Sequence, residues 1–147
     1  MGSVHYPPGD GAPPWIDWAL RELGRNVVEI PGPRHNARVL YYFGFTRYHA
    51  KADEIAWCSA FVCAALENAG VRSSRSARAS SYREWGIPCE LKDGAVCFFP
   101  PADPDAGGSG HVGFYWRGQL LGGNQRNRVS LADRDFTTVA AIRWPHF

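Results

Sequence analysis

The sequence has no long hydrophobic run and little net charge. Its longest strongly apolar run, residues 95–99, is five residues long, whereas a helix that crosses a bilayer needs about 20. The net charge is +2 with histidine neutral, which is too small to favour nucleic acid as a partner. We therefore expect no membrane span and no nucleic-acid partner.

The N-terminal segment lacks the features of a signal peptide. Residues 1–14 have neither a basic start nor an apolar stretch, and a secretory leader needs both. They are rich in glycine and proline, so we expect an irregular arm there and a single domain over residues 15–147. If the protein acts outside the cytoplasm, another agent must carry it there.

The four cysteines do not form a metal or disulfide pattern. No two of them have C-x-x-C spacing, and no histidine lies three to five residues from another, so neither a zinc site nor a redox dithiol is indicated. Without a signal peptide, a disulfide framework is not expected either. Most of these thiols should be buried apolar side chains, which leaves room for one nucleophile.

The first half of the chain predicts helices. Proline before and glycine after mark residues 15–23 as a helix, and a short helix is expected over 36–43. The clearest helix spans 57–69, because its apolar residues recur at helical spacing along one stripe. Gly70 would end it.

The second half predicts strands. Arg117-Gly118 looks like a two-residue hairpin turn between two apolar segments. The expected strands cover residues 94–99, 111–116, 119–123, 127–131 and 139–144. A chain in which the helices come first and the strands follow is typical of an α+β layer fold.

Two residues suggest nucleophilic catalysis. Cys58 lies at the start of the helix 57–69, where unpaired backbone N–H groups and the helix dipole lower the pKa of a thiol. A thiolate enzyme also needs a base and a residue that orients the base. Of the five histidines, His111 alone follows a glycine-rich loop and opens an alternating strand. Each residue alone is more often structural, but together they suggest a thiol hydrolase.

The hairpin register supplies a third residue. A two-residue turn pairs Trp116 with Gln119 and continues until His111 lies opposite Asn124, with their Cβ atoms about 5 Å apart. The amide oxygen of Asn124 would then accept a hydrogen bond from one ring nitrogen of His111. The other nitrogen would remain free for Cys58.

The same register makes two further predictions. Gln125 projects from the opposite face of the sheet, so we assign it no catalytic role. Gly113 lies opposite Gly122, which leaves a bare surface where a substrate approaches. A three-residue turn would shift the register by one residue and remove all of these predictions.

Several segments share the pattern of one enzyme family. They are EIAWCSAFVCAAL at 54–66, SARASSYREWG at 76–86, GHVGFY at 110–115, LLGGNQ at 120–125 and IRWP at 142–145, with EIPG at 29–32 and NARVL at 36–40 upstream. In this order they resemble the NlpC-type and CHAP-type cysteine peptidases, the papain-like hydrolases of bacterial cell walls, and in particular their small phage and bacterial members.

The resemblance implies a papain-like α+β fold in which the helix that carries the nucleophile packs on an antiparallel sheet. It assigns Cys58 as the nucleophile, His111 as the general base and Asn124 as the third, polar residue, a position that varies within the superfamily. No metal or organic cofactor is implied. Ala56 replaces a proline that relatives often have at the helix start.

The implied function is peptidoglycan hydrolysis by an endopeptidase that cuts an amide bond of the stem peptide. An N-acetylmuramoyl-L-alanine amidase acting on the same polymer is one alternative, and a non-catalytic cell-wall-binding module is another. Candidate substrate-binding residues are Trp57, Trp85, Arg78 and Tyr115. For the aromatic residues the alternative is packing in the core or the cleft wall, and for the arginine it is a solvated face.

An enzyme with no signal peptide and no repeated binding module fits two settings. It is either a phage lysin or an antibacterial toxin delivered by a secretion apparatus. Both would be made in the cytoplasm and would act in the periplasm or cell wall. A delivered toxin would also need an immunity protein as a partner in the producing cell.

Overall fold

Three helices precede the strands. The computed structural model describes residues 12–30, 36–47, 57–103 and 108–146, so residues 1–11 of the expected arm, and Ala56, lie outside the described residues. The helices are α1 (Pro14–Gly24), α2 (Ala37–Phe43) and α3 (Cys58–Asn68), and two short 3₁₀ turns follow, η1 (Ala79–Tyr82) and η3 (Phe136–Thr138). No helix in these ranges is long and apolar enough to cross a bilayer.

Six described strands form one antiparallel sheet. They are β1 (Ile87–Pro88), β2 (Val96–Phe99), β3 (His111–Trp116), β4 (Gln119–Gln125), β5 (Arg128–Ala132) and β6 (Ala141–Trp144). Their order is β1-β6-β2-β3-β4-β5. The predicted α+β class is therefore confirmed, and each predicted helix and strand ends within two residues of its expected bounds. The short strand β1 was not predicted.

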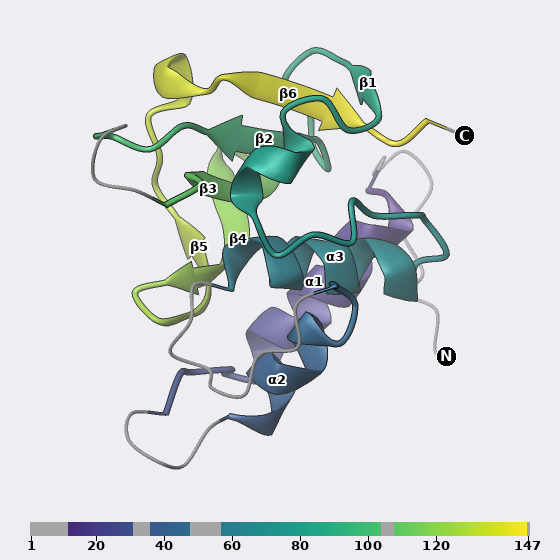
Figure 1. The fold of residues 1–147 in the computed structure, drawn as a ribbon, viewed down its shortest axis with the longest axis vertical. Helices are drawn as coiled ribbons and strands as arrows, with labels where there is room; N and C mark the ends of the chain where they lie inside the picture. The colour runs from purple at the N-terminus through teal and green to yellow at the C-terminus, as the bar shows by residue number, and fades with distance from the viewer. Residues whose placement is uncertain (1–11, 31–35, 48–56, 104–107, 147) are drawn as a thin grey trace.

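Helix α3 lies between the sheet and the other helices (Figure 1). Every residue from Cys58 to Leu66 is buried, so the helix is enclosed on all sides rather than along the one predicted stripe. Its polar Ser59 is fully buried and donates a hydrogen bond to the carbonyl of Ser76, at 2.6 Å. This complete enclosure fixes the position of the helix start.

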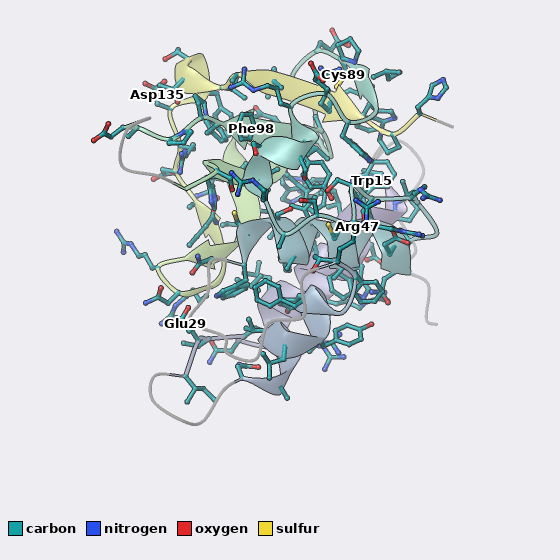
Figure 2. All side chains as sticks on the ribbon, in the orientation of Figure 1. Trp15, Glu29, Arg47, Cys89, Phe98 and Asp135 are labelled. Atoms are coloured by element: carbon teal, nitrogen blue, oxygen red, sulfur yellow. The ribbon has the colours of Figure 1, made fainter. Side chains whose placement is uncertain are left out.

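The two faces of the sheet pack against different side chains. Along β2, Val96 and Phe98 belong to the main core with the helices, whereas Cys97 and Phe99 belong to a smaller cluster on the other face. Strand side chains alternate between faces, so β2 is buried along its whole length. Trp15 of α1 is labelled in Figure 2. Its indole N–H donates to the carbonyl of Gly94, in the turn before β2, at 2.8 Å.

The β3–β4 hairpin has the predicted turn. Arg117 and Gly118 have φ values of 48° and 86°, and two successive residues of positive φ are typical of the type I′ turn that joins strands tightly. The pairs Trp116–Gln119, Tyr115–Leu120 and Phe114–Leu121 follow from it. The predicted register is confirmed over these three pairs.

A buried carboxylate joins α1 to α2. Glu22 is 1% exposed and accepts hydrogen bonds from the Tyr42 hydroxyl at 2.8 Å and from the Arg38 guanidinium at 2.5 and 2.9 Å. Burial, together with the negative charge of Glu22, raises the pKa of Tyr42 well above its ordinary value. A buried charge is tolerated because it is paired and hydrogen-bonded.

We expect Glu22→Ala to lower the free energy of unfolding by about 3 kcal/mol, since it leaves the part-buried Arg38 cation and the Tyr42 hydroxyl without their acceptor. Urea unfolding monitored by circular dichroism measures this. The exposed Glu90 offers a matched control, and Glu90→Ala should change stability by less than about 0.5 kcal/mol. If Glu22→Ala and Glu90→Ala lower the free energy of unfolding by the same amount, the ion pair of Glu22 and Arg38 has no structural role.

Candidate active site

A cavity of about 800 Å³ lies where the start of α3 meets the start of β3. Cys58 and His111 both line it, so the structure brings two of the predicted catalytic residues to one cavity. The rest of the described lining comes from residues 76–78, 100–102 and 108–110, together with Arg47 and Arg134. The site is therefore assembled from segments that are far apart in the sequence.

Cys58 is held as a thiol. It is 5% exposed, and burial raises the pKa of its thiol. The backbone N–H groups of Val112, Ser59 and Cys58 itself act in the opposite direction. The prediction that the helix start lowers this pKa is thus right for the local N–H groups and wrong for the net direction, because burial outweighs them.

His111 is oriented by Gln125, a residue to which the sequence assigned no role. Nε2 of His111 lies 3.0 Å from Oε1 of the buried Gln125. The amide nitrogen of Gln125 donates to the carbonyls of Leu120 and Ser130 at 3.1 and 2.8 Å. Carbonyl oxygens only accept, so the amide oxygen must face the ring, and His111 must donate from Nε2. Nδ1 then carries no proton in the neutral ring and is free to act as a base.

The environment keeps His111 neutral. Burial lowers the pKa of its imidazole, and the positive charge of Arg134 lowers it further. The hydrogen bond to Gln125 raises it, without reversing the net direction. A neutral imidazole in the same cavity as a protonated thiol is the starting state for a histidine that removes the thiol proton as the thiol attacks.

A bulge in β4 explains why Gln125, rather than Asn124, contacts the imidazole of His111. Gly122 pairs with Ser130 and Gln125 pairs with Arg128, so two residues of β4 lie opposite the single Val129 of β5. Asn124 has φ 56°, in the left-handed region. An extra residue of this kind reverses the side-chain alternation beyond it. The predictions that His111 faces Asn124 and that Gln125 points to the opposite face are therefore wrong.

The glycines near the site serve packing. A Cβ atom on Gly122 would lie 3.4 Å from the side chain of Gln125, and one on Gly113 would lie 2.8 Å from the side chain of Leu120. The space beside both glycines is filled by other side chains, so the prediction of a bare surface for substrate is wrong. A Cβ atom on Gly123 would lie 2.7 Å from the ring of Trp57, so the glycine allows α3 to pack closely on β4.

Only one of the four predicted substrate-binding residues belongs to the described lining of the cavity. That residue is Arg78. Trp57 is fully buried, and its indole N–H donates to Glu29 at 3.2 Å. Tyr115 packs in the cluster on the far face of the sheet, and Trp85 donates to a backbone carbonyl at 3.2 Å. These placements match the alternative of packing for the three aromatic residues.

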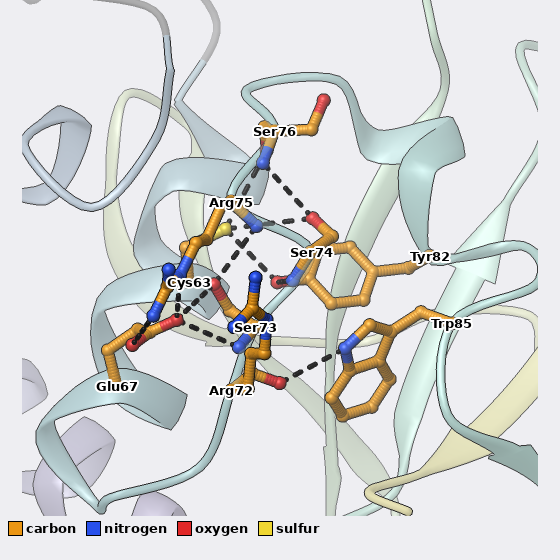
Figure 3. A network of polar contacts seen from close by, with 9 residues as sticks. All are labelled: Cys63, Glu67, Arg72, Ser73, Ser74, Arg75, Ser76, Tyr82 and Trp85. Carbon is orange, nitrogen blue, oxygen red and sulfur yellow. Dashed lines mark hydrogen bonds and ion pairs between the residues drawn. The ribbon is translucent and has the colours of Figure 1, made fainter.

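A polar network holds residues 73–76, which lead into the lining residues 76–78, against α3 (Figure 3). Glu67 accepts from the backbone N–H of Ser73 and from the guanidinium of Arg75, at 2.9 and 3.1 Å. The thiol of Cys63 lies 3.1 Å from the hydroxyl of Tyr82. Cys63 is thus a buried structural thiol, as predicted for the cysteines other than Cys58.

Arg134 is a site residue that sequence reasoning missed. Its guanidinium lies over the ring of Phe99, 4.4 Å from the centroid, and Phe99 pairs directly with His111 across β2 and β3. The positive charge of Arg134 lowers the pKa of both Cys58 and His111. No signal in the sequence distinguishes it from the other 13 arginines.

Within the described ranges, no three His, Cys, Asp or Glu side chains gather closely enough to hold a metal ion. Comparison of the chain with models of protein families and with curated protein sequences finds no match in either.

Removing the amide of Gln125 should lower the pKa of His111, because the hydrogen bond that it makes raises that pKa. NMR titration of the His111 ring in Gln125→Ala tests this. Gln125→Glu keeps the acceptor and adds a negative charge, so the pKa should rise instead. Since the neutral ring is the base, the acid limb of any His111-dependent rate should move with it, to lower pH in Gln125→Ala and to higher pH in Gln125→Glu.

The neighbouring asparagine provides the control for that titration. Asn124→Gly keeps the left-handed backbone, so the bulge is retained. It should leave the pKa of His111 unchanged. A shift in Asn124→Gly with none in Gln125→Ala would restore the register predicted from the sequence.

Proposed function

We propose that this protein is a papain-like cysteine hydrolase that cleaves an amide bond in the stem peptide of peptidoglycan. The observation that carries the proposal is the shared cavity of Cys58 and His111, with Gln125 fixing the imidazole. A nucleophile, a base and a residue that orients the base are the three parts that thiol catalysis requires.

The opposite pKa shifts indicate the order of proton transfers. Cys58 begins as a thiol and gives its proton to Nδ1 of His111 as the sulfur attacks the amide carbonyl. The negative oxygen that forms is met by backbone N–H groups at the start of α3, such as that of Cys58. His111 then returns the proton to the leaving amine, which leaves a thioester on Cys58. Water activated by the same imidazole hydrolyses this thioester.

The family resemblance is part of the support. WCSAF at the start of α3 and GHVGFY at the start of β3 supply Cys58 and His111 to the cavity. LLGGNQ in β4 does not line the cavity but supplies Gln125, which contacts His111. Membership of the NlpC-type and CHAP-type peptidases is our inference from this arrangement. The third residue of the site is then Gln125, the last residue of LLGGNQ, rather than Asn124.

The bond that is cut and the setting follow from the same proposal. We favour an endopeptidase over an amidase because the resemblance is to NlpC-type enzymes, which cut within the stem peptide. The enzyme would act in the periplasm or cell wall after phage lysis or delivery by a secretion apparatus. An immunity protein would protect a producing cell. A wall-binding module would leave without a role the oriented His111 in the same cavity as Cys58.

Purified sacculi incubated with the protein should release new muropeptides, and their masses should identify the bond. Fragments cut within the stem peptide support the endopeptidase, and intact stem peptides freed from the sugar support the amidase. Cys58→Ala should abolish release. Cys89 lies beside β1, at the edge of the sheet (Figure 2), and Cys89→Ala should keep full activity. Binding to sacculi with no release would establish the wall-binding module instead.

Fusion to an exported leader should make the protein lytic in a Gram-negative host, because the proposed substrate lies outside the inner membrane. The same chain without the leader should be tolerated in the cytoplasm. Culture density after induction measures both. The Cys58→Ala fusion is the matched control and should not lyse cells. Equal toxicity with and without the leader would argue for a cytoplasmic target.

A further inference from the structure

Three arginines from separate segments line the cavity of Cys58 and His111. They are Arg47, Arg78 and Arg134. The described lining contains no aspartate or glutamate, and in the described part of the chain no ion pair joins any of the three to a carboxylate. The cavity therefore carries positive charge that the described residues do not neutralise.

Some neighbouring arginines, in contrast, pair with carboxylates. Arg75 lies on the same segment as Arg78, three residues earlier, and pairs with Glu67 at 3.1 Å. In the helices, Arg25 and Arg38 both pair with Glu22. Among the described residues, no carboxylate forms an ion pair with an arginine of the cavity lining, and the same is true of Arg72 outside it.

The cavity arginines are held in place by contacts that leave their charge available. Arg134 stacks on Phe99, an aromatic contact that a guanidinium makes without losing its hydrogen-bond donors. The backbone N–H of Arg47 donates to the carbonyl of Arg75 at 2.9 Å, and that of Arg78 donates to the hydroxyl of Ser76 at 3.1 Å. The backbone N–H of Ala79, next to Arg78, donates to the hydroxyl of Ser109 in the lining at 2.9 Å, so both segments are fixed at the cavity wall.

We propose that the cavity selects substrates that carry a free carboxylate near the bond to be cut, with Arg78 and Arg134 as its binding residues. Guanidinium groups bind carboxylates through paired hydrogen bonds, and the positive charge of the described lining raises the local concentration of anions. The inference deepens the proposed function and rests on it for the substrate, since stem peptides carry free carboxylates. The preference for an anion can be tested without peptidoglycan.

Two alkylating reagents of similar size separate charge recognition from thiol reactivity. Iodoacetate carries a carboxylate, and iodoacetamide is its neutral counterpart. The thiolate sulfur displaces iodide from the CH₂ carbon of each reagent, which leaves a carboxymethyl group or a carbamidomethyl group on the sulfur, and the thiol proton is released. The rate at Cys58 is followed by mass spectrometry of the peptide that contains it. We expect the ratio of the iodoacetate rate to the iodoacetamide rate to be about tenfold higher at Cys58 than in glutathione.

Single substitutions then assign the preference to residues. Arg78→Gln and Arg134→Gln should each lower the ratio about threefold to fivefold. The ratio cancels any change in the thiol pKa, which matters for Arg134 because its charge also affects Cys58. The matched control is Arg72→Gln, on the same segment as Arg78 and exposed but outside the described lining. A ratio equal to that of glutathione, or an equal fall in Arg72→Gln, would overturn the proposal.

A matched pair of stem peptides carries the test to the substrate. One keeps its free carboxylates, and the other has them converted to carboxamides. The wild-type kcat/KM should favour the carboxylate form about tenfold, and Arg78→Gln should reduce this preference about threefold to fivefold. A wild type that cuts both equally would refute the role of the arginines in substrate choice. If the alkylation ratio is raised but neither peptide is cut, the anion site stands and the peptidoglycan function fails.

Discussion

The enclosure of α3 is the constraint on which the site depends. A helix with every residue from Cys58 to Leu66 buried cannot rotate or slide without opening the core on several sides at once. Its first residue is therefore fixed relative to the start of β3, where His111 lies. The same burial that positions the sulfur also raises the pKa of the thiol, so the position and the protonation state of Cys58 have one cause.

The fold was largely predictable because its signals are local. Proline and glycine at helix ends, the apolar stripe of 57–69 and the Arg117-Gly118 turn each depend on neighbouring residues, and the structure reproduces the elements that they predict. The placement of Cys58 and His111 in one cavity follows from helix and strand starts that could be recognised in the sequence. The complete burial of α3 could not be, because it depends on how α1, α2 and the sheet pack around the helix.

The error over Asn124 has a definite physical origin. Register was extended along β4 as though the strand were regular, but one extra residue opposite Val129 reverses the alternation. The available hint was Gly122-Gly123 followed by asparagine, the non-glycine residue that most readily adopts positive φ. Nothing in the sequence indicated that Arg134 lies at the site. It is placed there by its contact with the ring of Phe99, 35 positions away in the chain, and such a long-range contact leaves no local pattern.

The residue that orients His111 is an amide, and an amide does not titrate. A carboxylate in that position would gain a proton near pH 4 and would then present a donor as well as an acceptor to the ring. Gln125 presents the same oxygen at every pH, because its nitrogen is committed to two backbone carbonyls. The amide that orients the ring therefore does not change with acid, whereas the imidazole itself gains a proton and can no longer act as a base.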